Sequence, residues 1–338
     1  MYVDVALDSI ITYAITVGAS DIHFDPILNS IQVRLRIDGL LTEYMLVDAT
    51  DADMLVNRIK VFSGMDISEK RLPQDGRWEW SVKSYAVTMR VSSLPSLYGE
   101  AIVCRLMGNE GVHKNLLELG MGVELQEKIA ALLKRPYGLI TICGPTGSGK
   151  TATLYAMLRM LNLKETKLIC LEDPVEATIE GAIQIGINEK IGFTFSKGLR
   201  TVLRQDPDSI MIGEIRDNET AQLAVKAALT GHRVITTVHT NTALGVIGRL
   251  VDMGVEPYLL HATLIGSLSQ RLVRRIDSTT HSYQGRLGLF EYLEIPFSDI
   301  DWDHVEQYMF TSLQDSAHLA INSGITTLEE VHRAGILL

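Results

Sequence analysis

The chain has 338 residues, of which 46% are hydrophobic and 6% aromatic, with 31 Lys and Arg against 41 Asp and Glu. This composition excludes a wholly disordered chain, and the length favours two domains, each large enough to bury a hydrophobic core. The formal net charge of -10 argues against a dedicated nucleic-acid-binding protein, which usually carries a basic surplus.

The sequence lacks the signals of a membrane-spanning or exported protein. It holds no run of about 18 or more apolar residues, and the first basic residue is Arg34, so the N-terminus lacks the positive region of a signal peptide. Cys104, Cys143 and Cys170 are far apart and form no disulfide framework and no CxxC zinc pattern. A reduced, cytosolic protein is the simplest interpretation.

The first third of the chain has the pattern of a small α/β domain, expected over residues 1–107. Apolar residues recur at helical spacing over residues 7–15, and Gly18 follows in a helix-ending position. Residues 31–37 alternate apolar and polar, which predicts a strand, and Asp38-Gly39 is typical of a hairpin turn. A further helix and two further strands are expected at residues 52–62, 85–91 and 101–106.

Beyond a polar, glycine-containing linker, expected at residues 108–118, strand-like and helical segments alternate up to residue 276. Such alternation, with near-continuously apolar strands, predicts an α/β domain with a mostly parallel sheet covered on both faces. The tail, residues 277–338, is expected to be mainly helical, with Thr327 and Glu330 forming a capping box at the last helix. The strands and helices expected in the sheet domain are residues 138–143, a helix from 150, 167–171, 209–213, a helix over 220–230, and 233–238.

Residues 144–151 match the phosphate-loop motif G-x-x-x-x-G-K-[ST] in full, between an expected strand and an expected helix. The glycines allow main-chain N–H groups to curl around phosphate oxygens, and the helix N-terminus adds the positive end of its dipole. Lys150 is expected to reach the β- and γ-phosphates of ATP, and the Thr151 hydroxyl to bind Mg²⁺. The expected nucleotide-binding residues are Gly144, Pro145, Thr146, Gly147, Ser148, Gly149, Lys150 and Thr151.

Two acids follow apolar strands, and the carboxyl ends of parallel strands are where the phosphate loop also lies. Glu172 ends one strand, with Pro174 biasing Asp173 away from helical geometry, and Glu214 follows another. Glu214 is expected to serve Mg²⁺, and the other acid to orient the attacking water. Both could instead be exposed loop acids.

Two histidines, His232 and His239, flank the last predicted strand of this domain. Their odd separation would place them on opposite faces of one strand, so they cannot share a metal ion. His239 is expected at the strand end beside the acids, within reach of the γ-phosphate or the attacking water. His232 is expected in the turn before the strand, and a structural role stays open for both.

Seven strings of residues follow one another in the order of a known pattern: residues 18–23, 69–77, 90–95, 144–151, 171–176, 198–216 and 230–242. Together they resemble the bacterial secretion ATPases, in the branch that powers type II secretion and type IV pilus assembly. The resemblance implies a RecA-like ATPase core, a preceding PAS-like α+β domain and a short helical C-terminal region. It also implies a homohexamer that hydrolyses ATP with Mg²⁺ at the cytoplasmic face of the inner membrane. The partner implied is an inner-membrane platform protein, on which the hexamer would act.

The resemblance assigns roles residue by residue. Glu172 would be the general base or water-orienting acid and Glu214 the Mg²⁺ acid, with His232 and His239 as a histidine pair. Arg90 and Arg105 would neutralise γ-phosphate charge, as arginines brought in by domain closure can. The expected subunit-interface residues are Arg200, Arg204 and Arg216.

Two features stay open from the sequence. Arg200 and Arg204 are an i,i+4 pair and could be only a solvated basic face. Many relatives carry a four-cysteine zinc module after the segment matching residues 270–275, but residues 275–284 hold no cysteine, so no zinc is expected. Many also carry a further N-terminal docking domain, which this chain is not expected to have.

Two other functions remain as alternatives. A nucleotide-gated assembly factor would bind ATP and hydrolyse little, which the acids Glu172 and Glu214 argue against. A conjugation or DNA-uptake motor would share the core fold, but the net charge argues against direct contact with nucleic acid.

Overall fold

The computed structural model describes residues 2–82, 85–107, 111–296 and 298–338. Its contacts divide the chain into two compact units, an N-terminal unit (Met1–Gly108) and a C-terminal unit (Asn109–Leu338). The linker expected at residues 108–118 begins with residues 108–110, which lie outside the described residues. Its remaining residues, 111–118, fall within the C-terminal unit.

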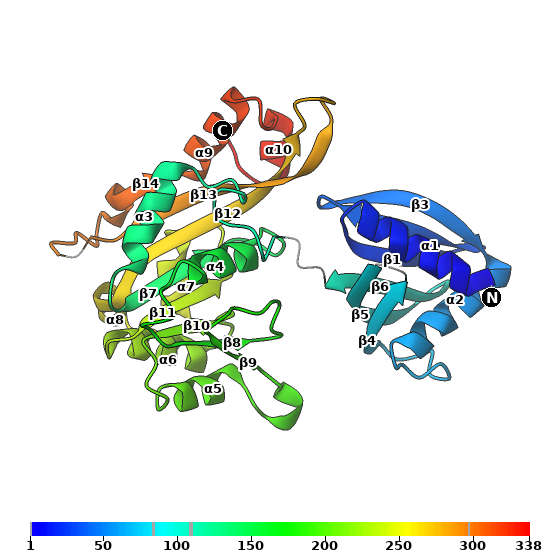
Figure 1. The fold of residues 1–338 in the computed structure, drawn as a ribbon, viewed down its shortest axis with the longest axis horizontal. Coiled ribbons are helices and arrows are strands. Elements are labelled where there is room, and N and C mark those ends of the chain that lie inside the picture. Colours follow the sequence, from blue (N-terminus) through cyan, green and yellow to red (C-terminus); the bar gives the residue numbers. More distant parts are fainter. Residues whose placement is uncertain (1, 83–84, 108–110, 297) are drawn as a thin grey trace. The chain divides into compact units, whose positions relative to one another are not determined.

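The N-terminal unit is built on a six-stranded antiparallel sheet in the order β3-β2-β1-β6-β5-β4 (Figure 1). Alternate residues of β1, β2, β4, β5 and β6, such as Phe24 and Val33, are buried in one core with helix residues such as Ile10 and Ile59, so the helices cover one face of the sheet. Its elements are α1 (Tyr2–Thr16), β1 (Ala19–Ile27), β2 (Ser30–Ile37), β3 (Leu40–Asp48), α2 (Ala49–Phe62), β4 (Gln74–Val82), β5 (Tyr85–Ser96) and β6 (Gly99–Met107).

The elements predicted for this unit are present. α1 ends at Thr16, and Gly18 behind it has a φ of 67°, a left-handed conformation that favours glycine. Asp38 and Gly39 turn the β2–β3 hairpin with φ of 48° and 87°, as a two-residue hairpin turn requires. β1 and β4 were not predicted, because proline, glycine and aspartate in them read as strand breakers.

The C-terminal unit is built on an eight-stranded sheet in the order β14-β13-β12-β7-β11-β10-β8-β9. The strands from β12 to β9 are parallel, whereas β13 and β14 are antiparallel to their neighbours. Successive strand residues alternate between two cores, Leu139 in one and Ile140 in the other, so both faces are covered. The mixed α/β class expected from the sequence is therefore confirmed.

The helices and strands of this unit are α3 (Val123–Leu133), β7 (Gly138–Cys143), α4 (Lys150–Leu158), β8 (Leu168–Glu172), β9 (Ile183–Gly186), α5 (Phe195–Val202), β10 (Ser209–Ile212), α6 (Asn218–Leu229), β11 (Arg233–Val238), α7 (Gly245–Asp252), α8 (Pro257–Thr263), β12 (Leu264–Ile276), β13 (Tyr283–Glu294), β14 (Met309–Thr311), α9 (Leu313–Asn322) and α10 (Leu328–Arg333), with short 3₁₀ turns at Glu189–Ile191 and Val305–Tyr308.

The C-terminal region contains the expected helices, α9 and α10, but also strands that the sequence did not predict. β13 pairs antiparallel with β12 along most of its length, so residues 283–294 belong to the large sheet rather than to a helical subdomain. Gly285 and Gly288 lower the strand propensity of this segment, and its pairing with β12 offsets that loss.

Glu330 fastens the C-terminal helices to the sheet. The residue is 1% exposed, and its carboxylate accepts hydrogen bonds from Arg274 of β12 and from Arg333, whose Nε lies 3.0 Å from both oxygens. Thr327 Oγ1 accepts from Glu330 N at 3.2 Å and caps α10. The predicted capping box is therefore only half formed, because the Glu330 side chain bonds to arginines instead of turning back to the cap.

Replacing Glu330 by glutamine is expected to lower the free energy of unfolding at pH 7 by about 3 kcal/mol. Burial acts to raise the pKa of Glu330, but Arg274 and Arg333 outweigh it and lower the pKa from 4.5 to about 2. Because the folded pKa is the lower one, this stabilisation is present above pH 4.5 and is lost as the pH falls towards 2. Urea unfolding across this pH range checks the expectation. The control is Glu329→Gln, which changes an exposed glutamate. Equal losses of unfolding free energy in the two variants would contradict the expectation.

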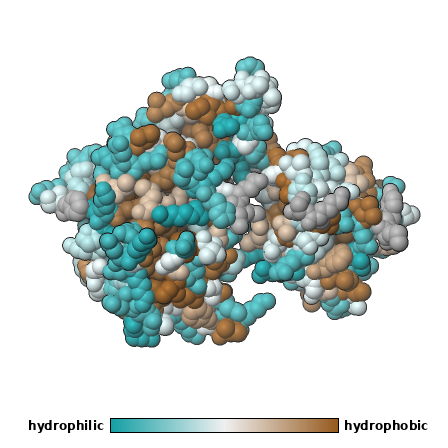
Figure 2. Space-filling view, viewed as in Figure 1, coloured by the Kyte–Doolittle hydropathy of each residue, from teal (hydrophilic) through white to brown (hydrophobic). Residues whose placement is uncertain are grey.

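The surface carries scattered apolar side chains. In the described part of the chain, no helix is long and apolar enough to cross a membrane. Large exposed apolar residues occur on both units, such as Leu97 and Leu337, and Figure 2 shows hydrophobic patches separated by hydrophilic residues. Isolated residues of this kind are ordinary on a folded protein.

Candidate nucleotide site

The loop between β7 and α4 has the backbone that the phosphate-loop motif requires. Gly144, Gly147 and Gly149 have φ of 146°, 76° and 86°, which side-chain-bearing residues rarely adopt. A Cβ on Gly144 would lie 2.5 Å from Ser148 Oγ, and one on Gly149 would lie 2.8 Å from Gln270 Nε2. Glycine is therefore needed at Gly144 and Gly149 for both conformation and space, and at Gly147 for conformation alone, since nothing lies within 4 Å of a Cβ there.

Lys150 begins α4 and is 8% exposed. Its ammonium group donates hydrogen bonds to the carbonyls of Gly144 at 2.8 Å and Pro145 at 2.9 Å, and burial lowers its pKa. The Ser148 hydroxyl is buried and has no hydrogen-bond partner among the described residues. A buried cation held by carbonyls beside an unsatisfied hydroxyl and a helix N-terminus suits a phosphate group.

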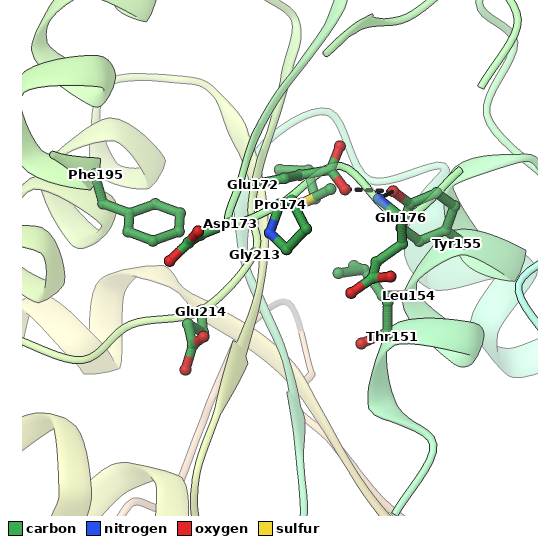
Figure 3. Close-up of a pocket in the computed structure, with 11 residues that line it drawn as sticks. Thr151, Leu154, Tyr155, Glu172, Asp173, Pro174, Glu176, Phe195, Gly213 and Glu214 are labelled. Atoms are coloured by element: carbon green, nitrogen blue, oxygen red, sulfur yellow. Dashed lines mark hydrogen bonds between the residues drawn. The ribbon is translucent and has the colours of Figure 1, made fainter. Parts of the chain in front are cut away.

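One pocket brings Thr151, Glu172 and Glu214 together (Figure 3). Leu171 of β8 pairs with Ile212 of β10, so the residues that follow them meet at the same edge of the sheet. Thr151 comes from the first turn of α4 and faces the same space. The structure thus gathers the three residues that the sequence analysis assigned to water and metal.

Glu172 is only 3% exposed and both of its carboxylate oxygens are engaged. Tyr155 of α4 donates its hydroxyl to Oε2, and Gln184 of β9 donates to Oε1 at 2.9 Å. Burial raises the pKa of Glu172 above its ordinary value, although the bonds from Tyr155 and Gln184 act in the opposite direction. The acid is therefore a better proton acceptor than an exposed glutamate.

Glu214 lies in a cluster of charges at the end of β10. Arg216 donates a hydrogen bond to Oε1, and His239 Nε2 lies 3.4 Å from Oε2. Arg216 Nη1 also lies 3.8 Å from Asp173 Oδ2, so this arginine bridges the acids of two strand ends. Partial burial acts to raise the pKa of Glu214, but Arg216 and His239 outweigh it and hold the pKa below its ordinary value.

The two predicted histidines lie at opposite ends of β11. His239 follows Val238 and contacts Glu214, as expected for the site. His232 precedes Arg233, and its Nδ1 lies 3.0 Å from the carbonyl of Ala227. At about 3.3 Å per strand residue, a strand of this length separates the two rings by roughly 20 Å. Within one chain, His232 is therefore not brought to the pocket.

The three arginines assigned to a subunit interface have different surroundings. Arg200 is exposed on α5 and donates to Glu219 Oε1 at 2.6 Å. Arg204 is also exposed but lies beyond the end of α5 at Val202, so the expected helical pair is only partly formed. Arg216, by contrast, belongs to the pocket through Glu214 and Asp173.

Arg90 and Arg105 belong to the N-terminal unit, on the sheet face opposite its helices. They are register partners on β5 and β6, so their side chains are cross-strand neighbours. Asp21 of β1 is 4% exposed and accepts from Arg105 Nε at 2.8 Å, while the Arg105 side chain is 63% exposed. The sequence alone indicates no role for Asp21.

Several other residues of the site were missed from the sequence. Tyr155 and Gln184 hold Glu172, and Gln270 packs against the phosphate loop, where its Oε1 accepts from Thr153 Oγ1 at 2.7 Å. The one available signal was Tyr155, a residue with a polar tip within the apolar stripe of α4. The others come from strands that only the sheet brings to the loop.

Known proteins with similar sequences support the earlier resemblance. A family model described as "Type II/IV secretion system protein" matches residues 2–333. The type II secretion system protein E of Klebsiella pneumoniae is 49% identical over 80% of this chain and 54% of its own length. The type II secretion system ATPase E of Vibrio cholerae is 40% identical over 97% of this chain and 74% of its own. The chain thus spans about half the length of several relatives that it matches.

Solved structures share the fold. The pilus retraction motor PilT with bound ADP has a TM-score of 0.68 at 29% identity, and the match covers 96% of this chain and 95% of that one. The Legionella pneumophila ATPase DotB has a TM-score of 0.77 at 22% identity, over 97% and 95% of the two chains. At 22% identity, the similarity to DotB shows a shared fold and no more.

Proposed function

We propose that this chain, which belongs to the family of type II/IV secretion system proteins, is a Mg²⁺-dependent ATPase. ATP hydrolysis would power type II protein secretion or type IV pilus assembly. The observation that carries the proposal is the pocket in which Thr151, Glu172 and Glu214 meet directly beside the phosphate loop.

The residues present fit a magnesium–nucleotide complex. Magnesium is usually held by one or two protein oxygens together with substrate phosphates, and the Thr151 hydroxyl and the Glu214 carboxylate supply such oxygens. Among the described residues, no three His, Cys, Asp or Glu side chains gather as a metal cluster of their own. When bound, the ion neutralises phosphate charge as the terminal phosphoryl group is transferred.

The chain's own groups divide the remaining work. The amides around Gly147 and the ammonium of Lys150 bind the phosphates, and Lys150 exchanges its carbonyl partners for phosphate oxygens. Glu172, fixed by Tyr155 and Gln184, orients the attacking water and accepts its proton. His239 and Arg216 hold the Glu214 carboxylate in place.

The working form is proposed as a homohexamer at the cytoplasmic face of the inner membrane, acting on a platform protein of the pilus or secretion apparatus. The exposed guanidiniums of Arg90, Arg200 and Arg204 support an assembly in which each nucleotide also meets cations from outside its own pocket. Arg105, oriented by Asp21, would join Arg90 in this role. His232 would act, if at all, at a boundary between subunits.

Purified protein is expected to release phosphate from ATP in the presence of Mg²⁺, and removal of the metal with EDTA is expected to stop the reaction. Added Mg²⁺ should restore it, because Thr151 and Glu214 need the ion to engage the phosphates. A phosphate-release assay with and without the chelator measures this. Tight ATP binding without phosphate release would favour a nucleotide-gated assembly factor instead.

A further inference from the structure

Arg271 of β12 is a buried cation whose contacts the proposed function does not explain. It is 7% exposed, and among the described residues its hydrogen bonds go to two main-chain carbonyls, those of Gln270 at 3.1 Å and Asn241 at 2.7 Å. Burial lowers the pKa of Arg271, and the nearby Glu291 carboxylate, which acts in the opposite direction, does not offset it. A buried charge of this kind is costly, so its retention calls for a specific use.

The Asn241 carbonyl belongs to the β11–α7 loop (residues 239–244), which begins with His239. Side chains from three strands bind its main chain. Asn241 O also accepts from Ser269 Oγ of β12 at 3.2 Å, and the amide of Ala243 donates to Glu291 Oε1 of β13 at 2.6 Å. Cys143 Sγ of β7 lies 3.2 Å from the carbonyl of Thr242. The β11–α7 loop is therefore held mainly by residues of β12 and β13, which lie on the other side of β7 from β11 in the sheet.

The same segment of β12 also touches the phosphate loop. Ser269 pairs with Cys143, the last residue of β7, so the residues that follow lie beside the loop itself. The Gln270 carbonyl, which Arg271 holds, lies 2.6 Å from where a Cβ on Gly144 would be. Arg271 is also close enough to Lys150 for its charge to act on the lysine. Arg271 thus connects the phosphate loop with the loop that carries His239.

We propose that Arg271 is a positioning residue for ATP hydrolysis, which holds the β11–α7 loop so that His239 stays against Glu214. The planar guanidinium bonds two carbonyls, Gln270 O of its own strand β12 and Asn241 O of the β11–α7 loop, a task for which the point charge of lysine is poorly suited. The inference rests on the proposed function. It assigns to Arg271 no contact with the nucleotide.

The first test replaces Arg271 by lysine and measures phosphate release and nucleotide affinity separately. The turnover number, kcat, is expected to fall roughly 10- to 100-fold, because a small displacement of a catalytic neighbour has effects of this size. The Kd for a fluorescent ATP analogue with Mg²⁺ is expected to stay within about twofold, since a positioning residue does not touch the ligand. A rise in Kd equal to the loss in kcat would make Arg271 a phosphate ligand and overturn the proposal.

Arg233 provides a matched control for the loss of a buried guanidinium. It is 8% exposed, and its Nε and Nη2 donate to the carbonyl of Arg135, but it begins β11, at the end of this strand opposite His239. Arg233→Lys should lower the melting temperature about as much as Arg271→Lys and leave kcat unchanged. Equal losses of kcat in the two variants would mean that the loss comes from lower stability, and they would contradict a positioning role.

Two further measurements keep the proposal testable if Arg271→Lys folds poorly. Ser269→Ala removes the second donor to Asn241 without touching a buried charge, and it should lower kcat by about two- to fivefold. In a double-mutant cycle, adding Arg271→Lys to His239→Ala should lower kcat almost no further, because the histidine through which Arg271 acts has already been removed. Fully additive losses would overturn the inference, whereas phosphate release that survives Lys150→Ala would instead overturn the proposed function.

Discussion

Replacing Lys150 by alanine is expected to lower ATP hydrolysis by about 10²–10³-fold or more, one of the two largest effects expected of a single change in this chain. The lysine ammonium sits inside the curl of the phosphate loop, bonded to the carbonyls of Gly144 and Pro145. Its removal takes away the positive charge that the loop holds at this point. Phosphate release from purified protein, with melting temperature as the test of folding, measures the effect.

Lys164 is the control for this substitution, since it is an exposed lysine a short distance beyond α4. Lys164→Ala should leave phosphate release unchanged. Full activity in Lys150→Ala would rule out the phosphate loop as the hydrolysis site, and the proposed ATPase would then have to be abandoned for this pocket.

Replacing Glu172 by glutamine is the second large effect, an expected loss of about 10²–10⁴-fold in kcat with nucleotide binding retained. Glutamine has nearly the same shape and keeps one accepting oxygen, so the side chain can stay in place with one of its two bonds, from Tyr155 or from Gln184, preserved. It cannot accept the proton of the attacking water, which burial has prepared Glu172 to do by raising its pKa. Phosphate release and the Kd for a fluorescent ATP analogue separate the two properties.

Glu165→Gln changes an exposed glutamate in the turn after α4 and should behave like the unchanged protein in both assays. If Glu172→Gln keeps its kcat, the water-orienting role must belong to another acid of the pocket. If it loses nucleotide affinity as well, Glu172 serves binding rather than the chemical step.

The nucleotide site could be predicted from the sequence to the extent that it is local. The glycine pattern of residues 144–151 requires a loop with positive φ between a strand and a helix, and the structure has that loop. Glu172, Glu214 and His239 each follow an apolar run directly, and parallel strands place their carboxyl ends at one edge. The residues next to each of these side chains in the sequence were therefore enough to predict its position.

The surroundings of the same residues could not be predicted in this way. Tyr155 and Gln184 hold Glu172 only because α4 and β9 pack beside β8, and Arg216 meets Asp173 only because β10 pairs with β8. Arg216, which was expected at a subunit interface, also lies between two acids of the pocket. These contacts depend on strand order, which one sequence does not state.

The sequence by itself determined the alternation of strands and helices, the phosphate loop and the positions of its acids, because glycine conformation and apolar periodicity act within a few residues. The tertiary structure decided which distant segments complete the pocket: β12 and β13 extend the sheet beside β7 and bring Arg271 and Glu291 to the loop of His239. The physical reason is that strand pairing and buried polar contacts join residues far apart in the sequence, and no local pattern of residues states which strands will pair.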